Sequence, residues 1–71
     1  MQLNEIVTYH PGTYDHTVLE GAGPFVALVT RIRPSGLVDV VFGDASGLGI
    51  ARTSVGVGAA SVPAEGYVAA Q

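Results

Sequence analysis

The feature that most constrains the fold is one hairpin motif between residues 24 and 44. Its two arms, residues 25–33 and 37–42, are rich in β-branched and aromatic residues, which favour strands. Between them stands Pro34-Ser35-Gly36, a turn signal, because proline presets φ and glycine accepts a positive φ without steric cost. The pattern predicts two antiparallel strands joined by a tight three-residue loop.

This loop predicts a register for the two arms. The predicted pairs, from the loop inward, are Arg33 with Leu37, Ile32 with Val38, Arg31 with Asp39, Thr30 with Val40, Val29 with Val41, and Leu28 with Phe42. The register places apolar pairs on one face and the opposite charges of Arg31 and Asp39 on the other. The second face still carries several apolar residues. We therefore expect both faces to be covered over part of their length, with a partner as the second cover.

Three further segments resemble short strands, which gives five in all. Residues 3–9 form the first and end at Pro11-Gly12, because proline cannot continue a ladder. Residues 13–23 form a long irregular loop, with Val18 and Leu19 as its inward-facing anchors. Residues 67–70 form the last strand, after a connector that is expected to make one tight helical turn at residues 62–65.

Residues 50–57 are the fourth strand. Strict alternation places Ile50, Arg52 and Ser54 on one face and puts Val55 on the other. Glycines at positions 56 and 58 are expected to weaken the end of this strand or to mark a bulge.

Five short strands, a long early loop and a central hairpin predict an all-β fold, either a small closed barrel or an open sandwich. The order resembles that of an SH3-like barrel, and residues 62–68 resemble the helical turn and last strand of that fold. The chain has no Trp and no Ala-Leu-Tyr-Asp-Tyr segment. We therefore do not expect the aromatic groove that binds proline-rich peptides.

Length and composition point towards assembly. Seventy-one residues allow one domain, residues 1–71, whose core is marginal at this size. There is no Cys, so no disulfide stabilises it, and charged residues make up only 13% of the chain against about 25% in an average soluble domain. Such a thin charged surface favours a protein that buries much of its exterior. The alternative is a Gly- and Ala-rich chain whose composition inflates the apolar count.

Charge and hydropathy exclude two classes of partner. The net charge is −3, the three arginines are scattered and there is no Lys, so the basic stripe of a nucleic-acid binder is missing. No apolar run approaches the roughly 20 residues that span a bilayer. The first five residues lack the basic region of a signal peptide, so we expect synthesis in a cytoplasm.

No group of residues predicts catalysis, a cofactor or a metal. His10 and His16 flank Asp15, but their spacing fits no closed zinc site. Three other acids, Asp39, Asp44 and Glu65, show no pattern of a catalytic pair, and no Ser lies in a Gly-x-Ser-x-Gly elbow. The glycine-rich residues 43–49 lack the Gly-Lys-Ser/Thr ending of a phosphate loop. We predict a protein that is not an enzyme.

The hairpin sequence Val29-Thr30-Arg31-Ile32, Pro34-Ser35-Gly36 and residues 38–42 resembles strand–turn–strand units of small virion accessory proteins of tailed bacteriophages. The resemblance implies a capsid decoration (cement) or head–tail protein, located in the virion and present in many copies. Its partners would be the major capsid protein or another virion protein and its own copies. The alternative is a small-barrel adaptor for a soluble host or regulatory protein.

Residues expected to contact a partner are the aromatics, the long loop and the hairpin arginines. They are Tyr9, Tyr14, His16, Val18, Leu19, Phe25, Arg31, Arg33 and Tyr67.

Overall fold

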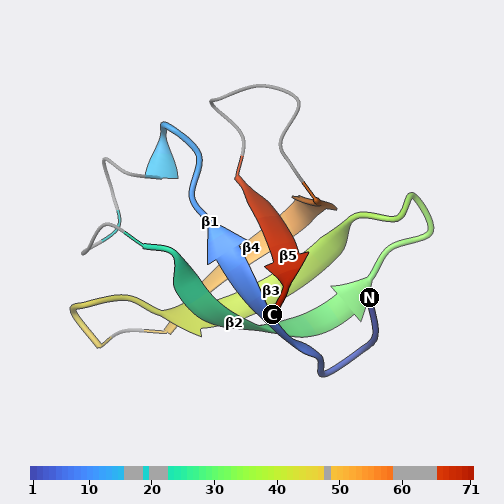
Figure 1. Ribbon diagram of the computed structural model, residues 1–71, viewed down its shortest axis with the longest axis horizontal. Coiled ribbons are helices and arrows are strands. Elements are labelled where there is room, and N and C mark those ends of the chain that lie inside the picture. Colours follow the sequence, from blue (N-terminus) through green and yellow to red (C-terminus); the bar gives the residue numbers. More distant parts are fainter. Residues whose placement is uncertain (16–18, 20–22, 48, 59–65) are drawn as a thin grey trace.

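The computed structural model describes residues 1–15, 19, 23–47, 49–58 and 66–71. Five strands close into a barrel in the order of the chain (Figure 1). They are β1 (Ile6–His10), β2 (Phe25–Ile32), β3 (Val38–Gly43), β4 (Gly49–Val57) and β5 (Tyr67–Ala70). All neighbours are antiparallel except β4 and β5, which are parallel. The all-β prediction is confirmed, and of the two predicted architectures the structure shows the closed barrel and not the open sandwich.

The strands begin and end close to their predicted positions, and the largest difference is at β1. This strand starts at Ile6 rather than at residue 3, because a turn precedes it. Asn4 has φ 65°, and the Glu5 N–H donates to the Gln2 carbonyl at 3.2 Å. The predicted helical turn at residues 62–65 lies outside the described residues.

The core is built mainly from valines on alternate positions of the strands. Its buried members are Val7, Tyr9, Leu19, Ala27, Val29, Val38, Val40, Phe42, Val55 and Val68. Fully burying a valine side chain contributes about 1.5–3 kcal/mol, and five valines here are almost completely buried. Leu19 lies inside, as predicted for an anchor of the long loop. Val18, the other predicted anchor, lies outside the described residues.

A β-bulge in β2 changes the predicted register of the hairpin. The pairs nearest the loop are those expected, Ile32 with Val38 and Arg31 with Asp39. The register then shifts at Thr30, so that Val29 faces Val40 instead of Val41. The inner predicted pairs are therefore wrong by one residue. The physical reason is that the shift buries Val29 completely and leaves the hydroxyl of Thr30 at the exposed surface.

A second bulge lies in β4 and overturns the predicted faces of that strand. Val38 faces Val55, whereas Val40 faces Arg52, so β4 carries one extra residue across this interval. Ser54, within it, has φ 55°. The bulge brings Val55 into the core that Ile50 also packs against, although alternation predicted opposite faces. It lies at Ser54 and not at the glycines that follow.

Candidate functional site

The strongest candidate site is a surface, which we call the outer apolar face: Ile6, Val26, Leu28, Val41 and Ala51. Four of its members form one row across four strands, because Ile6 pairs with Leu28, Leu28 with Val41, and Val41 with Ala51. Three large side chains are open to solvent, with exposed fractions of 49% for Ile6, 66% for Val26 and 38% for Val41, and Leu28 is half-buried. None of the five is charged, so the face can bury apolar area without desolvating an ion.

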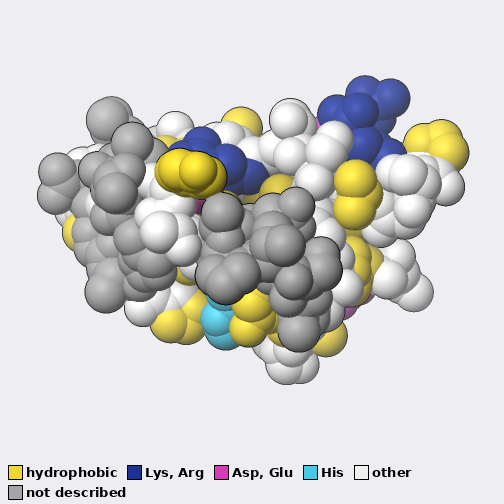
Figure 2. Space-filling view, turned by 90° about the horizontal axis from the view of Figure 1, so that it is seen from above, with side chains coloured by type: hydrophobic (Ala, Val, Ile, Leu, Met, Phe, Trp, Pro, Cys, Tyr) yellow, Lys and Arg dark blue, Asp and Glu magenta, His cyan; other side chains and the backbone are white. Residues whose placement is uncertain are grey.

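Apart from Val26, the neighbouring row carries small residues. Thr8 pairs with Val26, and on the far side of β3 Gly43 pairs with Gly49. Small side chains allow another surface to approach the backbone closely. In the space-filling view the cationic side chains form separate groups, with uncharged and hydrophobic surface between them (Figure 2).

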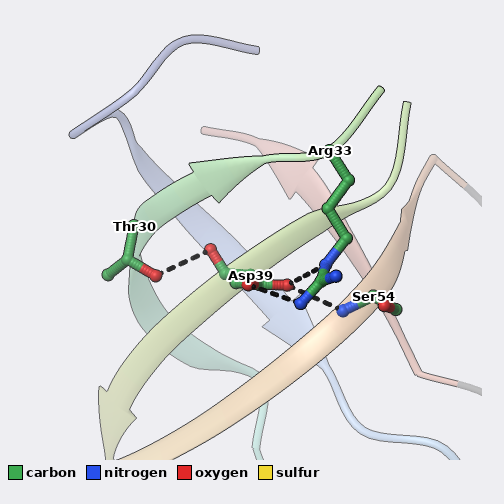
Figure 3. A network of polar contacts seen from close by, with 4 residues as sticks. All are labelled: Thr30, Arg33, Asp39 and Ser54. Atoms are coloured by element: carbon green, nitrogen blue, oxygen red, sulfur yellow. Dashed lines mark hydrogen bonds and ion pairs between the residues drawn. The ribbon is translucent and has the colours of Figure 1, made fainter. Parts of the chain in front are cut away.

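An ion pair within the hairpin joins Arg33, which follows β2, to Asp39 in β3 (Figure 3). The guanidinium binds both carboxylate oxygens, from Nε to Oδ1 at 2.8 Å and from Nη2 to Oδ2 at 3.0 Å. Oδ1 also accepts the backbone N–H of Ser54 at 2.9 Å, and the Thr30 hydroxyl donates to the Asp39 carbonyl at 3.3 Å. Asp39 therefore makes contacts to both bulged segments. Arg31 faces Asp39 across the ladder as predicted, but the guanidinium that forms the ion pair is that of Arg33.

These contacts lower the pKa of Asp39. The hydrogen bond from Arg33 is the largest cause, followed by the backbone N–H of Ser54. The carboxylate thus stays ionised and can accept these bonds at neutral pH. We interpret Asp39 as a structural residue that holds the two bulges in place.

A second polar cluster lies where the core meets the surface. The phenol of Tyr9 donates to Oδ2 of Asp15, and Nε of Arg52 donates to the same oxygen at 2.9 Å. The Tyr9 side chain is only 2% exposed, and its burial raises its pKa to about 12, with the hydrogen bond to Asp15 as the second cause. A tyrosine held neutral in this way is a structural donor, and the cluster ties the start of the long loop to β4.

Three aromatic rings stack in a line beneath this cluster. The Tyr9 and Phe42 ring centroids are 4.9 Å apart, and those of Phe25 and Phe42 are 5.2 Å apart. Gly66 lies against the first ring, because a Cβ atom there would stand 2.6 Å from the Tyr9 hydroxyl oxygen. The Tyr9 and Phe42 rings belong to the core, and Phe25 packs half-buried against it.

Some residues predicted to contact a partner are buried instead. Tyr9 is in the core, because the barrel needs a large ring at this position and Asp15 satisfies its hydroxyl. Leu19 is also in the core, and Phe25 packs half-buried against it. The buried side chains of Tyr9 and Leu19 can support a docking surface but cannot form one, whereas Phe25 keeps part of its surface exposed. The alternation of β1 would have predicted the burial of Tyr9, because Val7 shares its face.

The other predicted residues differ in their exposure. Tyr14 is 75% exposed, and Arg31 is exposed at the hairpin end. Tyr67 is half-buried and stacks on His10, with ring centroids 4.6 Å apart. Arg33 is occupied by its ion pair with Asp39. His16 and Val18 lie outside the described residues.

Sequence reasoning did not select the outer apolar face as a site, although it expected the hairpin to be covered on both sides. The signal was present in Val41 and Leu28. The predicted register separated these two residues, so their common row with Ile6 and Ala51 appears only once the bulge at Thr30 is known.

Within the described part of the chain, no three or more His, Cys, Asp or Glu residues are grouped so that they could hold a metal ion. The same part contains no helix that is long and apolar enough to cross a membrane. No family model, curated protein or solved structure matches this chain.

Proposed function

We propose that the protein is a non-enzymatic structural component of a viral particle, a capsid decoration protein that docks on the shell protein and on its own copies. The observation that carries the proposal is the outer apolar face, an uncharged row across four strands on a chain of 71 residues. The resemblance of the hairpin to virion accessory proteins is the reason for proposing a viral particle as the assembly.

The energetics favour action in many copies. The largest apolar patch on a typical monomer is about 300–600 Å², and burying about 300 Å² yields roughly 8 kcal/mol. The loss of translational and rotational freedom on association costs about 4–15 kcal/mol, which offsets most of that gain. One site of this size is therefore weak. On a shell with many equivalent sites, contacts between neighbouring copies add to each single contact and retain the protein.

We place the contact with the shell at the start of the segment that follows β1. Tyr14 exposes more of its surface than any other large apolar residue among those described. Tyrosine suits interfaces because its ring buries apolar area while its hydroxyl keeps a polar partner. The nearby Asp15–Arg52 ion pair ties this segment to β4 and limits the entropy that docking costs.

The first test is to sediment a native lysate of the source and to follow this chain across the gradient by mass spectrometry. A decoration protein travels with particles of megadalton size in high copy number. A chain that stays near the top of the gradient as a small species contradicts the proposal and favours the adaptor function instead.

Substitution then locates the contact. Tyr14→Ala should release the chain from purified particles while its thermal unfolding stays close to that of the wild type, because the side chain is mostly in solvent. Leu3→Ala, at another exposed apolar residue, is the matched control and should remain bound. Equal retention of both variants would remove Tyr14 from the docking surface.

A further inference from the structure

The outer apolar face is bordered by opposite charges at the two ends of β3. At the hairpin end, Arg31 is exposed, and it faces Asp39 near the start of the strand. At the other end, Asp44 follows Gly43 directly in the next turn. Val41 lies between these two ends, and the whole interval is about 17 Å long at about 3.3 Å per residue. Along β3 the surface is thus positive at the hairpin end, apolar in the middle and negative at the other end.

The hairpin end is cationic within an acidic chain. Arg31 and Arg33 contribute +2 and Asp39 contributes −1, so residues 30–39 carry +1 in a chain of net charge −3. The remaining charges sum to −4 by subtraction. Two of the three arginines therefore lie at one end of β3, and a partner surface that meets this end is expected to be acidic.

From this pattern we infer that the outer apolar face is the interface of a two-fold symmetric dimer of this chain, with the two β3 strands antiparallel across it. The two-fold axis of this dimer lies between the two stacked faces, next to Val41, and runs perpendicular to β3. It brings Arg31 of each copy over Asp44 of the other. An interface of this type uses the same patch twice, so the patch must be complementary to itself. An apolar centre between opposite charges meets that requirement.

Charge also selects between the two ways of stacking this face on itself. With parallel strands, Arg31 would lie over Arg31 and Asp44 over Asp44, which is repulsive at both ends. Only the antiparallel arrangement pairs opposite charges. Asp44 accepts both the N–H and the hydroxyl of Ser46 at Oδ1, and these bonds hold its carboxylate at this end of β3.

The size of the face predicts a weak dimer. Four strands about 4.8 Å apart, over about four residues of length, give a footprint of roughly 250 Å². A standard interface buries about 800 Å² per partner, which would be about a fifth of the 4240 Å² surface of this chain. We therefore expect a dissociation constant in the high micromolar range. The inference names what covers the outer apolar face and does not depend on a viral setting.

The test is sedimentation equilibrium of the full chain over a range of concentrations. The wild type should fit a monomer–dimer equilibrium that does not continue to larger species, because a two-fold contact closes at two copies. Arg31→Glu and Asp44→Arg should each weaken the dimer about tenfold, since each variant meets its own copy with like charges at both ends. An equimolar mixture of the two variants should recover dimerisation, because both contacts then pair opposite charges.

The apolar centre is tested with a matched pair of substitutions. Val41→Thr keeps a β-branched side chain and places a hydroxyl in the interface, so it should weaken the dimer. Val57→Thr makes the same change at an exposed valine outside the face and should leave the dimer constant unchanged. Thermal unfolding of every variant shows whether it is folded, and Asp44→Asn retains the turn hydrogen bond if the Arg variant does not fold.

Several results would overturn the inference. A wild type that stays monomeric at millimolar concentration would do so and would leave the capsid proposal open. A dimer that responds equally to Val41→Thr and Val57→Thr would place the interface elsewhere. If the mixture of charge variants associates no better than either variant alone, the antiparallel arrangement is wrong.

Discussion

Tyr9 offers the sharpest test of how the core and the polar cluster support each other. Its ring stacks on Phe42 inside the barrel, and its phenol donates to Asp15. Tyr9→Phe keeps the ring and removes only the hydroxyl. A hydrogen bond to a charged group contributes about 1.5–3 kcal/mol, so we expect the variant to lose about that much free energy of unfolding at neutral pH.

The pKa of Tyr9 adds a second expectation with a definite sign. The folded protein raises this pKa from 10.0 to about 12, mainly through burial. Between these two values the unfolded chain loses the phenol proton while the folded chain keeps it, so stability falls as the pH rises. Two pKa units correspond to about 2.7 kcal/mol. Because Asp15 and Arg52 remain partly in solvent, screening reduces this, and we expect a loss of about 1–2 kcal/mol.

The assay is denaturant unfolding of the wild type and of Tyr9→Phe at a series of pH values from about 9 to about 12. The wild type should have the larger free energy of unfolding at the lower pH values. The difference between the two proteins should shrink as the pH rises across this interval. Tyr67→Phe is the control, because it removes a half-buried phenol outside the core. If the wild-type and Tyr9→Phe curves stay parallel, the Tyr9 hydroxyl does not stabilise the fold in the way described.

Two further substitutions test the bulges and the packing. Asp39→Asn should lower the stability at neutral pH and weaken its dependence on acid, because the pKa of Asp39 is lowered from 3.8 and its contribution is lost as the pH falls through the folded-state value. Acid unfolding monitored by circular dichroism checks this, and an unchanged acid midpoint would contradict it. Gly66→Ala should cost about 1–3 kcal/mol, because the added Cβ meets the Tyr9 ring. Gly56→Ala, where nothing lies within 4 Å of the added Cβ, is its control, and equal thermal shifts would refute the close approach.

The positions of the strands could be predicted from the sequence because local signals specify them. Pro34 and Gly36 fix the hairpin loop, and the β-branched runs on either side have no competing helical pattern. The first two ladder pairs next to the loop follow directly from its length. The last strand, residues 67–70, was also placed correctly.

The bulges could not be predicted because neither bulged position carries a glycine or another residue that disfavours a regular strand. Ser54 adopts φ 55° without being a glycine, and Thr30 is a good strand residue. The available clue was Asp39, a carboxylate within the apolar run of β3. A buried carboxylate needs donors on either side, and the backbone N–H of Ser54 reaches it from the bulged segment of β4. A charge inside an apolar strand is thus a reason to expect irregular neighbours.

The same bulge decides which side chains form the surface. Without the register shift at Thr30, Leu28 would face Phe42 and lie inside the barrel with it, and Val29 would lie outside. With the shift, Val29 fills the core and Leu28 joins Val41 on the outer apolar face. Asp39, by contacting both bulged segments, therefore acts on the outer face from a distance. A variant that removes the hydrogen bonds of the Asp39 carboxylate should weaken any contact that uses this face, even though Asp39 is not a member of it.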